Sequence, residues 1–303
     1  MLKDRIASTS VVTALAPAVW GSTYIVTTEL LPPDRPLLAS TMRALPAGLL
    51  LLAIGRAAPH GIWWLRTIVL GVLNIGAFFY FLFVAAYHLP GGVAALVGSV
   101  QPLLVLILGA LLLKDRIRAH HLIACAVGSA GVGLLVLQPE AALDTMGVLA
   151  GLVGACSMAA GIVLTKRWGR PPGMGVLTFT GWQLSVGGVV LVPVTLLAED
   201  LPTTLTRENA IGFAYLGVVG ALFAYSIWFR GIERLPALVM PFLGFVSPLA
   251  ATALGYFILG QALGPVQIIG ALAIIFAVVL VQPRKKRTSE PVSADGPVSQ
   301  RAG

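Results

Sequence analysis

Residues 91–113 read GGVAALVGSVQPLLVLILGALLL, a run without a charged side chain. As an α-helix, a run of about 20 apolar residues is long enough to cross the hydrocarbon core of a bilayer. Residues 262–282, ALGPVQIIGALAIIFAVVLVQ, form a second run of this kind. Inside lipid every backbone amide and carbonyl needs a partner within the protein, which a helix provides for itself. The two runs therefore predict membrane-spanning helices.

The composition of the whole chain agrees with this interpretation. Hydrophobic residues make up 57% of the 303 residues and charged residues only 11%, whereas a soluble domain carries about 25% charged residues. So few charges do not cover a water-facing surface of this size. We expect an all-α membrane protein whose main partner is the lipid bilayer.

Short links rich in proline, glycine or charge separate ten apolar segments. Because nine further segments follow the first, we expect the first to be an uncleaved helix and not a signal peptide. After the last segment, the basic run 284–287 predicts an inner-face anchor, and the polar stretch 288–303 predicts a disordered cytoplasmic tail. The ten predicted helices span residues 12–31, 36–55, 67–87, 91–113, 119–138, 145–165, 174–197, 210–230, 237–259 and 263–282.

The orientation of the chain follows from the basic residues of the short loops. With the N-terminus in the cytoplasm, the outer side receives only Arg35 and Arg207, and all other loop arginines and lysines face inward. We therefore expect an inner-membrane protein of bacterial type with both termini cytoplasmic. The net charge of +8 comes from residues scattered through these loops, so we expect no nucleic-acid partner.

The two halves of the chain resemble each other. From residue 71 to residue 123 the match runs without a gap at a shift of 146 residues, and it pairs Pro102 with Pro248. Five helices in each half would insert the second half upside down, an arrangement typical of secondary transporters. We predict a first repeat over residues 1–139, an inverted second repeat over 140–283, and an anchor and tail over 284–303.

Two short stretches and one helix exit carry a resemblance to a known family. Residues 19–24 (VWGSTY), residues 43–50 (RALPAGLL) and the exit LKDR at 113–116 resemble the EamA family of the drug/metabolite transporter superfamily, over about residues 10–283. Within it, residues 19–52 resemble the PecM-like subgroup, to which export of the blue pigment indigoidine is ascribed. The resemblance implies ten helices, both termini inside, and efflux of amino acids, metabolites or drugs. The family often has an acid at the exits of both its fourth and ninth helices, whereas here Asp115 has Gln261 as its counterpart.

Arg43 is the one cation clearly within a predicted span. A charge there costs roughly 3 kcal/mol on insertion scales. Two interpretations stay open: a cavity-facing cation that binds a substrate carboxylate or a mobile counter-ion, and an arginine bound to helix-end carbonyls that stabilises the fold. Glu29, about one turn below the outer end of the first helix, is the candidate for energy coupling, and it either pairs with Arg43 or faces water.

Other polar and aromatic side chains lie at membrane depth, where an amide that faced lipid would be unsatisfied. Any one of them alone is more often a contact between helices. Together they favour a central cavity suited to a planar, weakly polar organic molecule. The candidates for substrate binding are Trp20, Ser22, Thr23, Tyr24, Arg43, Tyr80, Gln101, Gln183, Tyr225 and Ser247.

Pro102 and Pro248 fall in the middle of their predicted helices. Each removes one intrahelical hydrogen bond, which predicts either a static kink or a pair of hinges beside the cavity.

Three functions suit a multi-pass membrane protein: a secondary transporter, a membrane-embedded enzyme, and a receptor or scaffold. An enzyme needs convergent histidines or carboxylates at membrane depth, and a receptor does not need an inverted repeat. No GxxxxGK[ST] loop for ATP occurs. We therefore predict a transporter, not an enzyme, that exports a small organic molecule by alternating access without a cofactor or a metal. The family resemblance alone favours proton coupling over facilitation or exchange.

Overall fold

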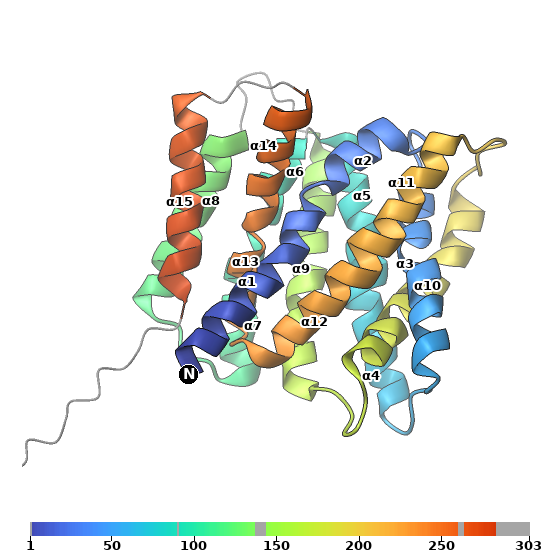
Figure 1. Cartoon of the computed structure of the whole chain (residues 1–303), viewed down its shortest axis with the longest axis horizontal. Coiled ribbons are helices and arrows are strands. Elements are labelled where there is room, and N and C mark those ends of the chain that lie inside the picture. The colour runs from blue at the N-terminus through green and yellow to red at the C-terminus, as the bar shows by residue number, and fades with distance from the viewer. Residues whose placement is uncertain (1, 90, 137–143, 260–263, 283–303) are drawn as a thin grey trace, which may run out of the picture.

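The computed structural model describes residues 2–89, 91–136, 144–259 and 264–282, and every regular element within these ranges is a helix (Figure 1). In the described residues, eight helical stretches are long and apolar enough to cross a membrane, and Ala119–Leu135 and Pro265–Val281 are shorter apolar helices. The protein is therefore an all-helical, multi-pass membrane protein. The predicted tail, the boundary between residues 139 and 140, and Gln261 lie outside the described residues.

Each predicted segment overlaps one helix or a run of consecutive helices. In chain order they are α1 (Leu2–Trp20), α2 (Thr23–Leu30), α3 (Pro36–Gly55), α4 (Trp63–Gly71), η1 (Val72–Ala77), α5 (Phe78–His88), α6 (Gly91–Gly98), α7 (Gln101–Leu113), α8 (Ala119–Val136), α9 (Thr145–Trp168), α10 (Val176–Ala198), α11 (Arg207–Gly217), η2 (Val218–Phe223), α12 (Ala224–Arg234), α13 (Met240–Leu243), α14 (Val246–Leu259) and α15 (Pro265–Val281).

Three of the predicted helices are interrupted rather than continuous. Short turns separate α1 from α2, α6 from α7, and α13 from α14. Pro102 and Pro248, predicted in the middle of their helices, lie instead in first turns: Pro102 is the second residue of α7 and Pro248 the third of α14. Proline is tolerated in a first turn because the amide it lacks would have no partner within the helix.

Two other predicted helices continue through a π-helical turn. The turn η1 joins α4 to α5, and the turn η2 joins α11 to α12. Val72 and Val218, where the two turns begin, are 146 residues apart, the shift that aligns the two halves of the sequence. Such turns widen the helix and often occur at functional sites.

Glycines allow the closest helix pairs to form. Helix α3 packs along α10, and α8 packs along α15. A side chain on Gly188 would lie 2.7 Å from Cα of Leu45, and one on Gly270 would lie 2.6 Å from the carbonyl oxygen of Gly131. Small residues at such contacts let backbones approach closely, which is how helices associate in lipid.

Carboxylates and hydroxyls cap the ends of several helices. The carboxylate of Glu199, just after α10, accepts hydrogen bonds from the amides of Leu37 and Leu38 at 2.6 and 2.9 Å. Asp144 caps α9 through the amide of Gly147 at 2.8 Å. These bonds satisfy first-turn amides that have no partner within their own helix. The Glu199 bonds also fix α3 to α10 at one edge of the molecule.

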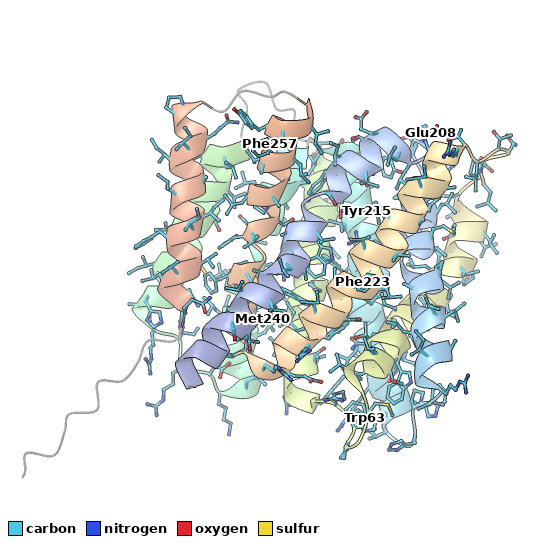
Figure 2. All side chains as sticks on the ribbon, viewed as in Figure 1. Trp63, Glu208, Tyr215, Phe223, Met240 and Phe257 are labelled. Carbon is cyan, nitrogen blue, oxygen red and sulfur yellow. The ribbon has the colours of Figure 1, made fainter. Side chains whose placement is uncertain are left out.

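The first and last described helices meet at one edge. The hydroxyl of Ser10 donates to Oε1 of Gln282 at 2.9 Å, and Figure 1 shows the start of α1 and the end of α15 at the same edge. Figure 2 places Trp63 near that edge and Glu208 near the opposite one. Phe257 is 80% exposed, as expected for a side chain that faces lipid.

Candidate functional site

A cavity of about 150 Å³ lies between the interrupted helices. All three interruptions reach it: Tyr24 follows the first, Ser99 lies in the second and Phe245 in the third. Eight of the residues singled out in the sequence line this cavity, namely Trp20, Thr23, Tyr24, Arg43, Gln101, Pro102, Ser247 and Pro248.

Gly21, in the first interruption, lets α14 approach. A side chain there would lie 2.5 Å from the carbonyl oxygen of Ser247 and 2.8 Å from Cβ of Ala250. Only glycine allows this contact. It brings the end of α1 against the start of α14, so that Trp20 and Ser247 face the same cavity.

Arg43 reaches the cavity from α3 and is 1% exposed. Its guanidinium lies over the ring of Phe79, 4.6 Å from the centroid. Nη1 donates to Oγ1 of Thr23 at 3.4 Å, and Nη2 donates to the carbonyl of Gly220 at 3.3 Å. Nε has no hydrogen-bond partner. Both acceptors are neutral and both bonds are long, so the charge is only weakly compensated.

The π-helical turn η2 supplies the acceptor next to Arg43. The carbonyl oxygen of Gly220 also accepts a hydrogen bond from Nε1 of Trp20 at 2.9 Å. A π-helical turn breaks the regular i→i+4 pattern, which leaves a carbonyl available to side chains. The carbonyl oxygen of Gly220 thus binds both Trp20 and Arg43.

The ring of Trp20 packs in an aromatic cluster. Its ring centroid lies 4.8 Å from that of Tyr225 and 5.1 Å from that of Trp228. Trp228 lines the cavity, whereas Tyr225 is fully buried and packs on Phe79 at 5.5 Å. Tyr225 therefore holds the walls of the cavity in place and does not line it.

Four further candidates from the sequence lie away from the cavity lining. Ser22 bonds to the hydroxyl of Tyr215 at 2.7 Å, and Tyr80 packs against the ring of Phe81 at 5.0 Å. Gln183 accepts a hydrogen bond from Asn74 at 2.8 Å, which links α10 to η1. Glu29 is exposed on α2.

The ion pair considered between Glu29 and Arg43 is not formed. The carboxylate of Glu29 accepts a weak hydrogen bond from the hydroxyl of Thr28 at 3.4 Å, while Arg43 is bound to Thr23 and Gly220. Glu29 lies on a part of α2 that faces outward, so its side chain does not reach the guanidinium.

Sequence reasoning missed the contribution of α9. Gly151, Gly154, Ala155 and Met158 form one wall of the cavity. A search for polar side chains passes over such residues. The spacing of Gly151 and Gly154, three residues apart on one helix face, is the signal that was available.

Comparisons with known proteins agree on one family. The model of the EamA-like transporter family matches the chain twice, over residues 8–137 and 145–282. The chain is similar to Protein PecM of Dickeya dadantii (strain 3937), with 50% identity over 267 residues that cover 88% of this chain and 90% of PecM. It is 29% identical over 270 residues to the uncharacterized inner membrane transporter YedA of Escherichia coli (strain K12), covering 87% of each. A protein of known crystal structure shares the fold, with a TM-score of 0.76 and 19% identity over 90% of this chain and 96% of its own.

Proposed function

The chain belongs to the EamA-like transporter family, and on that premise we propose that it is a secondary transporter that exports a small organic metabolite by alternating access. The resemblance predicted from the sequence, to this family and to PecM, is confirmed. Membership of this family makes the chain a membrane transporter, and it favours transport over an enzymatic or scaffold role. The direction, the substrate class and the mechanism are what we propose.

We infer ten membrane crossings built as two inverted five-helix repeats, over residues 1–139 and 140–283. Three observations support this architecture. The family model matches twice, and the turns η1 and η2 start 146 residues apart. The interruption before α7 also has a counterpart before α14, and the prolines that follow them, Pro102 and Pro248, are 146 residues apart. Two equivalent bundles around one cavity suit a transporter that opens it to either side in turn.

We further propose that both termini lie in the cytoplasm and that the membrane is an inner membrane of bacterial type. The contact between Ser10 and Gln282 supports a common side for the start of α1 and the end of α15. The basic loops support the cytoplasm as that side.

The observation that carries the proposed site is the cavity where the three interrupted helices meet. Irregular backbone at membrane depth is tolerated where it lines a cavity or is buried in protein. Trp20, Tyr24 and Trp228 offer flat apolar faces, and Gln101 and Ser247 offer hydrogen bonds. This combination suits a planar organic molecule.

Filling the cavity tests the proposal. Gly98 lines the cavity, and a side chain added to it would meet no atom within 4 Å. We therefore expect Gly98→Leu to fold normally and to reduce export at least about tenfold, because the new side chain occupies the space of the substrate. The measurement is metabolite export from cells that contain the variant, at matched protein level and melting temperature.

The matched control is Gly175→Leu, at an exposed position outside the cavity where a side chain also has room. This control should export at the rate of the unaltered protein. Normal export by a well-folded Gly98→Leu protein would reject the cavity as the transport site.

A further inference from the structure

The cavity holds a net positive charge. Among the described residues that line it, Arg43 alone is charged, and its side chain is 1% exposed. A guanidinium keeps its charge at physiological pH. A buried cation without a counter-ion is costly at membrane depth, so the structure must offset this charge in some way.

The protein itself offsets the positive charge of Arg43 only in part. The hydroxyl of Thr23 and the carbonyl of Gly220 are neutral acceptors, at 3.4 and 3.3 Å, and Nε has no partner. Two acids of neighbouring segments do not compensate it: Glu29 is exposed, and the carboxylate of Glu199 is bound to the first amides of α3. The remaining source of negative charge is a molecule bound in the cavity.

The other residues that line the cavity favour a planar anion over other anions. The rings of Trp20, Phe78 and Trp228 give the cavity flat apolar walls. We propose that the transported metabolite is a planar organic anion, such as an aromatic carboxylate, whose negative oxygen atoms bind Arg43 while its ring packs between these walls. This inference rests on the proposed transport function and names the class of its substrate.

If the substrate is an anion, the membrane potential can drive its export. A membrane potential of 100 mV, negative inside, holds a monovalent anion at a concentration roughly 50-fold higher outside at equilibrium. The loaded site, cation plus anion, is neutral, and the empty site is positive. The same potential therefore favours the return of the empty site to the cytoplasmic side. One negative charge leaves the cell in each cycle, and export needs no other ion.

Proton exchange, which the family resemblance favoured, has little support in this cavity. The titratable groups around Arg43 are the phenols of Tyr24, Tyr215 and Tyr225, and a phenol does not exchange its proton readily near neutral pH. Among the described lining residues there is no carboxylate or histidine. The membrane potential is therefore the coupling that this site supports.

The test uses the full-length protein in liposomes whose potential is set by a potassium gradient and valinomycin. The probes are a panel of benzoate derivatives, each paired with the benzamide of the same shape. We expect the benzoates to move with a current of one negative charge per molecule and a rate that rises with the potential. The benzamides should move at least about tenfold more slowly, because a neutral group loses the charged hydrogen bonds to Arg43.

Two variants locate the effect at the proposed residue. Arg43→Gln should abolish the preference for benzoate over benzamide, and Arg43→Lys should keep part of it. Arg207→Gln, at an exposed cation remote from the cavity lining, should keep all of it. Equal rates for the two members of each pair, or benzoate movement that follows a pH gradient and ignores the potential, would overturn the inference.

Metabolite profiles of cells with and without the protein separate this inference from the proposed function. If the exported metabolites are uncharged, transport stands and the anionic substrate is rejected. If they are acids, both stand. If no metabolite differs in its distribution, the proposed export itself fails.

Discussion

Lys166, which is half-buried, and Arg43, which is buried, differ in how completely their hydrogen-bond donors are satisfied by the protein. Nζ of Lys166, near the end of α9, donates to the carbonyls of Ile232, Glu233 and Leu235 at 2.9, 3.1 and 2.8 Å. Arg43 makes two longer bonds and leaves Nε without a partner.

The difference indicates what each cation does. An ammonium has three donors, and Lys166 uses all of them on carbonyls at the end of α12, where a helix lacks partners and a positive charge is favoured. Lys166 therefore stabilises the fold by binding the end of α12 to α9. A guanidinium has five donors, and Arg43, which lines the cavity, makes two long hydrogen bonds and leaves Nε without a partner. This difference supports the proposal that Arg43 binds the substrate.

Removing the charge of Arg43 should have the largest effect. We expect Arg43→Gln to reduce transport about 100-fold, because hydrogen bonds to a charged group contribute roughly 1.5–3 kcal/mol each. Its melting temperature in detergent should change little, since the membrane-embedded fold tolerates a neutral amide more easily than a charge. A lowered melting temperature with normal transport per folded molecule would make Arg43 a structural residue instead.

Removing the charge of Lys166 should lower the stability of the fold rather than the transport rate per folded molecule. Lys166→Met leaves three carbonyls of the α12 end without their donor, and we expect a loss of about 2–3 kcal/mol in the free energy of unfolding. Thermal melting in detergent measures this loss, and transport should be normalised to the folded fraction. A variant that melts like the unaltered protein but does not transport would show that Lys166 takes part in the transport cycle.

The ion pair beside Lys166 should matter least. Nε of Arg170 lies 2.6 Å from Oε1 of Glu233, and the two side chains are 28% and 23% exposed. Because water screens such a pair, Glu233→Gln should cost at most about 1 kcal/mol. The cost should shrink in high salt, which melting curves at two salt concentrations check. A salt-independent loss would point to packing rather than charge.

The sequence was sufficient to locate the helices and part of the lining, because both depend on local features. Hydrophobic runs mark the spans, and Arg43 stands out as a charge inside one of them. The helix face that each residue occupies depends on the neighbouring helices, which no local pattern reveals. For this reason Gln183 was a reasonable candidate, yet it bonds to Asn74 between helices.

Backbone features were the least predictable part of the site. The carbonyl of Gly220 binds both Trp20 and Arg43. It is free to do so because Val218–Phe223 form a π-helical turn, which the sequence of these residues does not predict. Prolines gave a partial signal, since Pro102 and Pro248 lie just after two of the interruptions. The interruption at Gly21 follows from its close contact with α14, which is a tertiary effect.

The most direct test of the assignment is the rise in melting temperature that the exported metabolite produces in purified protein. A ligand that binds only the folded state stabilises it by about 2.7 kcal/mol at 100 times its dissociation constant. At one fixed, high metabolite concentration, we predict a clear rise for the unaltered protein and for Lys166→Met, and none for Arg43→Gln. An equal rise in all three proteins would contradict the claim that Arg43 binds the substrate.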